Sequence, residues 1–301
     1  MTLQFFELPW EAMVKVSGED ALPYLQSQMS IDFQKLPIGS TRLGLRLSLK
    51  GRVLFGAQVI RTDEEEFILA CQETPAEQVI ELLEENVVAD EVEFEIVAGS
   101  WMASHLHHPG SYDQALEKIG LEKIQAGNAY AQQAGWVYVD PLLPQYCLTV
   151  LYTLENLPSW RENLAPSDSS MLEHMRLRTG LFRPGLELGE EEFPQEGGLE
   201  EIAVDFDKGC YLGQEVMARI HAMGNVRKQA VAVKGREVHQ GLLPLTLLNE
   251  QKKVGRLKTQ FSLPGKKDWI GAAIIHENSI GILKNEGLQI EGSGETIYPL
   301  T

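Results

Sequence analysis

The densest group of chemically capable residues lies between positions 204 and 221, in the segment VDFDKGCYLGQEVMARIH. A glycine-bounded turn in this segment precedes a helix that we expect to begin at about Leu212. Cys210 then lies just before the helix, near unpaired backbone N–H groups and two residues from Lys208. Both the helix terminus and the lysine favour the thiolate over the thiol. The segment therefore predicts a reactive thiol, and a small cysteine buried beneath the turn is the alternative.

The elements upstream, which must position this segment, alternate between helix and strand patterns. Ser17 and Asp20 resemble a capping box and predict a helix over about 18–29. Apolar residues alternate before and after a turn at Lys50-Gly51-Arg52, which predicts a long hairpin with one apolar face. The same patterns predict a strand at 67–71, a helix at 75–86 and a strand at 92–97. Helices set among antiparallel hairpins favour an α+β fold over a doubly wound sheet.

The remainder of the chain changes character twice. Prolines break the middle into short pieces. Within it, the apolar period of 169–179 predicts a helix that ends at Gly180. Residues 187–201 carry seven Glu and no base, which predicts an exposed loop. Short strands separated by Gly and Pro turns then predict a small closed β-barrel, at 229–234, 253–258, 271–276 and 287–292. We therefore expect two domains, 1–226 with two interleaved α+β subdomains and 227–301 with the barrel.

Charge is distributed unevenly between these two parts. Residues 1–226 carry 15 Lys and Arg against 36 Asp and Glu, or −21, whereas residues 227–301 carry 11 against 7, or +4. The total of −17 disfavours direct nucleic-acid binding, which needs clustered cations. No apolar stretch is long enough to span a bilayer and no secretory signal is present, so we expect a cytoplasmic protein without membrane contact.

Few other motifs carry chemistry. Cys71, Cys147 and Cys210 are widely spaced and can build neither a disulfide framework nor a four-thiolate metal site, so no metal is expected. The histidines of His105-Leu106-His107-His108 lack a nearby acid or cysteine and read as a surface loop. Alternation places Arg42, Arg46 and Arg52 opposite the hairpin leucines, where solvent exposure is the default and contact with the anionic tail of a ligand the alternative. Phosphate-loop, dinucleotide-binding and hydrolase signatures do not occur.

The string Lys208-Gly209-Cys210-Tyr211-Leu212-Gly213-Gln214-Glu215 resembles the KGCYxGQE signature of YgfZ-type folate-binding proteins, which are similar in fold to the T-protein (aminomethyltransferase) of glycine cleavage. Further pieces resemble the same family along most of the chain: Gly18-Glu19-Asp20-Ala21, Leu25-Gln26, Lys50-Gly51-Arg52, Arg178-Thr179-Gly180, Pro194-Gln195-Glu196 and Arg219-Ile220-His221 with Gly224. Residues 101–165 show no such match.

The resemblance implies a ring of three subdomains around a channel that holds tetrahydrofolate or a derivative. It also implies a role in making or maintaining iron–sulfur enzymes, including those that modify tRNA, with iron–sulfur proteins or their assembly factors as partners. Cys210 and Lys208 are the catalytic candidates. The folate-binding candidates are Glu196, Tyr211, Gln214, Glu215 and Arg219. Glu196 matches the T-protein carboxylate that contacts the pterin, and a carboxylate can accept paired N–H bonds from that ring.

One departure from the T-protein pattern separates three hypotheses. T-proteins carry an Asp pair after the hairpin turn, whereas Gly51 is followed here by Arg52-Val53-Leu54-Phe55, so glycine-cleavage activity is not expected. A folate-dependent accessory factor with a redox-active or cluster-contacting Cys210 is the first hypothesis. A one-carbon transferase that uses Lys208, Tyr211 or Glu215 for acid–base chemistry is the second. A noncatalytic scaffold with a structural Cys210 is the third.

Overall fold

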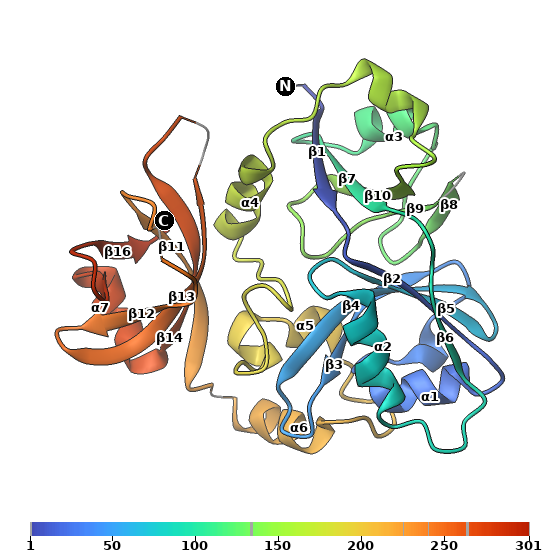
Figure 1. Ribbon diagram of the computed structural model, residues 1–301, viewed down its shortest axis with the longest axis horizontal. Coiled ribbons are helices and arrows are strands. Elements are labelled where there is room, and N and C mark those ends of the chain that lie inside the picture. The colour runs from blue at the N-terminus through green and yellow to red at the C-terminus, as the bar shows by residue number, and fades with distance from the viewer. Residues whose placement is uncertain (1, 133–134, 225, 240, 263–264, 301) are drawn as a thin grey trace.

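The computed structural model describes residues 2–132, 135–224, 226–239, 241–262 and 265–300. Residue 225, beside the predicted domain boundary at 226, lies outside these ranges. Two five-stranded antiparallel sheets and a closed six-stranded barrel make up the architecture. Figure 1 shows the two sheets one above the other on one side of the molecule, and the barrel on the other side. Within the described ranges, no helix is long and apolar enough to cross a membrane.

The first sheet has the strand order β3-β4-β5-β2-β6. Its strands are β2 (Ala12–Ser17), β3 (Thr41–Leu47), β4 (Val53–Asp63), β5 (Glu66–Cys71) and β6 (Glu93–Ile96). Helices α1 (Ala21–Gln28) and α2 (Ala76–Glu84) pack on one face through a shared apolar core, and a short 3-10 turn follows α1 at Phe33–Lys35. The predicted helices, hairpin and strands of this region are confirmed, but the capping box is not, because Asp20 makes no side-chain cap to α1.

The hairpin β3–β4 differs from the prediction of a single apolar face. Leu45 pairs with Gly56 and Arg46 with Phe55, and a bulge after Arg46 shifts the register. The leucines of β3 therefore lie on one face of the sheet, while Phe55 lies on the other with the core beneath α1 and α2. The prediction that Arg46 is exposed is wrong. It is 2% exposed and donates hydrogen bonds to the carbonyls of Leu47 and Leu82.

The second sheet has the order β1-β7-β10-β9-β8. Its strands are β1 (Gln4–Pro9), β7 (Trp101–His107), β8 (Tyr130–Gln132), β9 (Gly135–Tyr138) and β10 (Cys147–Thr153). Helix α3 (Asp113–Ile119) packs on it, and a 3-10 turn lies at Ser159–Asn163. The surface-loop prediction for His105 and His107 is wrong, since both side chains are buried on β7, which lies between β1 and β10 in this sheet. Burial lowers the pKa of His105 to about 3.

The C-terminal strands close a barrel in the order β11-β14-β13-β12-β15-β16, with β16 pairing back to β11. They are β11 (Lys228–Gly235), β12 (Leu245–Asn249), β13 (Lys252–Ser262), β14 (Trp269–His276), β15 (Leu288–Ile290) and β16 (Thr296–Pro299). A 3-10 turn at Glu277–Ser279 leads into α7 (Ile280–Asn285). The predicted barrel is confirmed, and β12, β16 and α7 are elements that the sequence patterns missed.

The linking segment, residues 164–224, runs from the second sheet to the barrel and contacts both. It contains α4 (Ser169–Arg178), a 3-10 turn at Pro194–Gly197, α5 (Glu200–Ala203) and α6 (Gln214–Met223). Helix α4 contacts β1 of the second sheet and both β13 and β14 of the barrel, and Figure 1 shows it between them. The leucines of β3 share a core with α6 and with β14. The linking segment therefore brings the KGCYLGQE loop against the first sheet.

Candidate functional site

Cys210 lies in the loop before α6 with its side chain exposed to solvent. Of the three cysteines, Cys71 and Cys147 are buried, and burial raises the pKa of each of these two thiols. The helix begins at Gln214, two residues later than predicted, and residues 204–207 form no strand. The alternative of a buried cysteine beneath the turn is therefore wrong, and Cys210 is the cysteine that a partner or reagent can reach.

Lys208 anchors this loop to the first sheet. Its ammonium donates hydrogen bonds to the carbonyl oxygens of Gln26 and Met29, both at 2.7 Å, and of Ile31 at 2.5 Å. These carbonyls belong to the end of α1 and the turn that follows, where no helical N–H is available to them. Burial lowers the pKa of Lys208 to about 8. All three ammonium donors are thus engaged by backbone oxygens, so the lysine positions the loop that carries Cys210.

Backbone contacts fix the rest of the loop. Tyr211 N–H donates to Gln214 Oε1 at 3.0 Å, and Leu212 N–H donates to the Ser27 carbonyl at 3.1 Å. Gly213 has φ +81°, and a Cβ atom there would lie 2.6 Å from the Ser48 carbonyl oxygen. Only glycine allows the loop this close to the β3–β4 hairpin. The signature therefore packs the start of α6 against the hairpin turn at Gly51.

The predicted folate-binding residues fall into three environments. Tyr211 is buried, its hydroxyl has no hydrogen-bond partner among the described residues, and burial raises the pKa of the phenol to about 12. Glu215 and Arg219 are exposed on α6. Gln214 is used by the loop itself, as its bond to Tyr211 shows. The structure thus brings Lys208, Tyr211 and Gln214 together around one turn, with Glu215 and Arg219 on the surface beyond it.

Glu196 belongs to a neighbouring turn. It is 3% exposed, and its Oε2 accepts a hydrogen bond from Phe193 N–H at 3.1 Å and lies 4.0 Å from Arg52 Nη1. Burial raises the pKa of Glu196, although the hydrogen bond from Phe193 N–H and the charges of Lys228 and Arg52 oppose that shift. Gln195 Nε2 donates to the Met217 carbonyl at 3.4 Å, which joins the turn to α6. The prediction that residues 187–201 form an exposed loop is wrong for Glu187, Glu192 and Glu196, whose side chains are buried.

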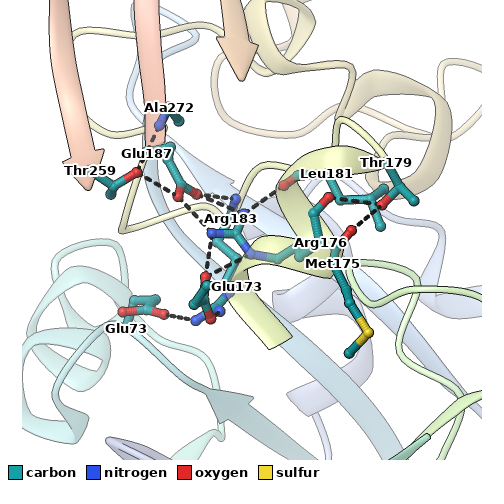
Figure 2. Close-up of polar contacts among 10 residues, drawn as sticks. All are labelled: Glu73, Glu173, Met175, Arg176, Thr179, Leu181, Arg183, Glu187, Thr259 and Ala272. Atoms are coloured by element: carbon teal, nitrogen blue, oxygen red, sulfur yellow. Dashed lines mark hydrogen bonds and ion pairs between the residues drawn. The ribbon is translucent and has the colours of Figure 1, made fainter. Parts of the chain in front are cut away.

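A buried network of ions lies between α4, the barrel and the first sheet, and sequence analysis missed it (Figure 2). Arg176 Nη2 lies 2.7 Å from both Glu173 Oε2 and Glu187 Oε1, and none of the Arg176 side chain is exposed. Arg183 bonds to Glu173 and to Glu73, the latter at 2.6 Å. The Glu187 carboxylate also accepts from Thr259 Oγ1 of β13 at 3.2 Å. Only the i,i+3 spacing of Glu173 and Arg176 was visible in the sequence.

A small central cavity lies beside this network. Its volume is about 30 Å³. Its lining comes from both sheets and the network segment: Trp10, Leu43, Gly56, Gln58, Ala70, Gln72, Glu73, Asp140, Leu142, Arg183 and Pro184. Trp10 Nε1, Gln58 Oε1 and Arg183 Nε have no hydrogen-bond partner among the described residues, and burial raises the pKa of Asp140. Buried polar groups without protein partners are typical of a site that binds water or a ligand.

Glu196 and Cys210 do not line this cavity. Within the described part of the chain, no cluster of three or more His, Cys, Asp or Glu side chains is arranged to hold a metal ion. The arrangement therefore offers two separate features, an exposed thiol on a fixed loop and a buried polar cavity at the junction of the sheets.

The family model of the GCVT N-terminal domain matches residues 3–128. An aminomethyltransferase of Thermoanaerobacter sp. (strain X514) is 22% identical over 293 residues, which cover 90% of this chain and 77% of that protein. Similarity to this family is therefore detected in the N-terminal part of the chain, over less than half of its length. The solved glycine cleavage system aminomethyltransferase T from Bartonella henselae has the same fold, with a TM-score of 0.78 over 99% of this chain and 84% of that one, at 15% identity. The predicted α+β T-protein fold is confirmed.

Other proteins that are similar to this chain carry different names. The tRNA-modifying protein YgfZ of Photobacterium profundum is 24% identical over 238 residues, which cover 76% of this chain and 68% of that protein. The mitochondrial iron–sulfur cluster assembly factor IBA57 homolog of Eremothecium gossypii is 48% identical, but over 61 residues that cover 19% of this chain and 13% of that protein. The relatives thus divide between aminomethyltransferases and proteins named for tRNA modification or iron–sulfur assembly.

Proposed function

We propose that this protein is a tetrahydrofolate-binding accessory factor that supports the assembly or repair of iron–sulfur enzymes, including tRNA-modifying ones, through the thiol of Cys210. The observation that carries the proposal is that the KGCYLGQE loop holds an exposed cysteine on a fixed backbone, while the other two cysteines are buried. A structural cysteine needs no such exposure. The YgfZ and IBA57 names of two relatives support the same assignment.

The thiol can supply one ligand and no more. An iron–sulfur cluster needs up to four protein ligands, so a cluster that touches Cys210 takes its other ligands from a client protein, an assembly factor or a small thiol. The anchoring of Lys208 on three carbonyls keeps the loop in place while a partner approaches. An exposed thiol on a fixed loop is suited to transient contact of this kind.

Folate fits the chemistry of the central cavity but not its volume. Trp10 supplies an N–H donor and Gln58 an acceptor without partners, and Asp140 is a buried carboxyl close to both sheets. These groups are the kinds that a pterin ring hydrogen-bonds. A cavity of about 30 Å³ holds about two water molecules at most. Folate therefore binds here only if the segment that carries Pro184 moves away from Gly56, and we assign no chemical step to the folate.

An aminomethyl transferase is the alternative that the Thermoanaerobacter relative favours. The first sheet argues against it. Val53 and Phe55 are fully buried among apolar side chains, and a Cβ atom on Gly56 would lie 2.1 Å from Pro184 Cγ. The start of β4 therefore has neither an acid nor the space for one at position 56. Without a carboxylate there, the strand lacks the group that would move a proton at a folate nitrogen.

The test of the thiol is a Cys210→Ser variant in cells that lack the endogenous protein. We expect a loss of iron–sulfur enzyme activity with unchanged thermal stability, because the exposed side chain contributes little to the fold. Iodoacetamide labelling of the native wild type provides the internal control: Cys210 should react, while Cys71 and Cys147 should react only after unfolding. Full activity of the Cys210→Ser variant in cells would refute the role of the thiol.

Folate binding is tested separately, by calorimetric titration of the purified protein with tetrahydrofolate. We expect binding by the wild type, weaker binding by Asp140→Asn, whose carboxyl lines the central cavity, and unchanged binding by the exposed control Glu190→Ala. Weaker binding by Glu196→Ala would instead place the pterin at Glu196, outside this cavity. A wild type that does not bind would remove folate from the proposal and leave the thiol to its own test. Release of formaldehyde or an aminomethyl group from a folate adduct would instead establish the transferase.

A further inference from the structure

A second cavity, of about 370 Å³, lies between the end of α4 and the barrel. Its lining includes His174 and Arg178 of α4, Lys234 at the end of β11, Arg236 just after that strand, and Lys266 before β14. We call this cavity the basic groove. Four permanently charged cations from three separate segments meet in it, in a chain whose net charge is −17.

The side chains of these four cations are unpaired within the described part of the chain. Arg178, Lys234, Arg236 and Lys266 form no side-chain hydrogen bond or ion pair with any residue that the structure describes. Asp268 is the one carboxylate in the lining, so four positive charges face one negative charge.

Two other cations of the barrel are paired. Arg256 and Lys258 of β13 bond to Glu191 and Glu192 of the linking segment, Lys258 at 3.0 Å. The chain has acids to spare, with 43 Asp and Glu against 26 Lys and Arg. Charges of one sign that line a concavity raise the local concentration of ions of the opposite sign. The basic groove therefore concentrates four cations in one concavity, next to a C-terminal domain that carries a net charge of +4.

The base of the groove is apolar and partly aromatic. Trp269 is 1% exposed and is fixed by a hydrogen bond from its Nε1 to the Glu237 carbonyl at 2.7 Å. Ile270 and Leu300 also line the groove, and Tyr298 stands beside them with 44% of its surface exposed. A flat ligand group can lie against the exposed tyrosine while its anionic part reaches the cations.

We propose that the basic groove binds a small ligand with two or more phosphates and a planar ring, of the nucleoside di- or triphosphate class. Arginine and lysine side chains bind phosphate oxygens through charge-assisted hydrogen bonds, which are among the stronger contacts a surface can make. The volume of the groove, about 370 Å³, suits a small molecule, whereas the acidic remainder of the chain repels a long polyanion such as RNA. The proposal does not depend on the thiol or on folate.

The test is calorimetric titration of the full-length protein with ATP, ADP, inorganic pyrophosphate and tri-γ-glutamate at about 0.15 M salt. We expect ATP and ADP to bind more tightly than pyrophosphate, and the affinity to fall as salt is raised. The double variant Lys234→Ala/Arg236→Ala should lose about tenfold or more in ATP affinity, since each cation contributes charge-assisted bonds. The control Lys252→Ala/Lys253→Ala removes two exposed barrel cations outside the groove and should bind as the wild type does.

Three results would overturn the proposal: no binding of ATP, ADP or pyrophosphate at millimolar concentration, equal loss in both double variants, or tighter binding of tri-γ-glutamate than of ATP. Thermal melting of the two double variants shows that both remain folded. Because all four substituted side chains are exposed, we expect their melting temperatures to match that of the wild type.

Discussion

The two faces of α4 differ in whether their charged side chains are buried or exposed. On one face Glu173 and Arg176 are buried, and every charge there has a partner of opposite sign. On the other face Arg178 is exposed in the basic groove and has no partner among the described residues. Two arginines only two residues apart on the same helix thus meet different physical requirements. The difference separates charges that hold the structure together from charges that remain available to a ligand.

Burial decides which of these conditions a charge can tolerate. Moving an ion out of water costs ~5 kcal/mol or more unless partners compensate for the lost hydration. Arg176 receives that compensation from Glu173, Glu187 and the Leu181 carbonyl. Arg178 keeps its hydration and needs no partner. An unpaired cation that is exposed inside a cavity, as in the basic groove, therefore remains available to bind an anionic ligand.

Removing Arg176 is the change from which we expect the largest effect. Arg176→Met leaves Glu173 and Glu187 buried with fewer partners, and should lower the free energy of unfolding by ~3 to 5 kcal/mol. Arg178→Ala, on the other face of the same helix, should change it by less than ~0.5 kcal/mol. Urea denaturation monitored by circular dichroism measures both. Equal effects of the two substitutions would contradict the distinction between the faces.

Lys208 sharpens the comparison, because it is a buried cation whose bonding partners are carbonyls rather than carboxylates. Lys208→Met removes the donor from three backbone oxygens and should lower the free energy of unfolding by ~1 to 3 kcal/mol. It should also raise the rate of iodoacetamide labelling at Cys210 as the loop loosens. Lys50→Met, an exposed neighbour on the hairpin turn, is the control. An unchanged stability of Lys208→Met would show that the carbonyls find other partners.

Most of the fold could be predicted from the sequence, because local patterns specify it. The period of α1 and α2, the alternation of β3 and β4 and the glycine-rich spacing of the barrel strands all lie within short windows. The T-protein fold itself followed from the resemblance of KGCYLGQE and the shorter motifs around it. The short strands β12 and β16 have only five and four residues, too few for a clear alternation.

What the sequence missed depends on contacts between distant residues. A stretch of seven Glu without a base is typical of an exposed loop, yet Glu187 is buried. The Arg176 guanidinium and the Arg183 backbone N–H, both outside that stretch, donate to its carboxylate. Arg46 is buried because the carbonyl of Leu82 lies within its reach. The position of Cys210 in a turn before a helix predicted that its thiol is accessible. No pattern near Lys208 in the sequence predicted that its ammonium binds the carbonyls at the end of α1. Pairing across long sequence separations is invisible to periodicity.

Glu196 is the intermediate case between the two faces of α4, since it is buried but its nearest cation, Arg52, lies 4.0 Å away. Burial raises the pKa of Glu196 above its ordinary value of 4.5. The folded state therefore holds a proton more readily than the unfolded chain does, and the stability that this group contributes is fully present below pH 4.5 and is lost as pH rises through the higher folded pKa.

Glu196→Gln replaces the carboxylate with a neutral side chain of similar shape that can still accept a hydrogen bond from Phe193 N–H. We expect the variant to be as stable as the wild type at about pH 4, and more stable at pH 7 by about 1 kcal/mol or less, because the ionised carboxylate is only partly compensated there. Urea denaturation at the two pH values measures the difference. A variant less stable than the wild type at pH 7 would mean that Arg52 compensates Glu196 fully, which would place this carboxylate with the paired ions around Arg176.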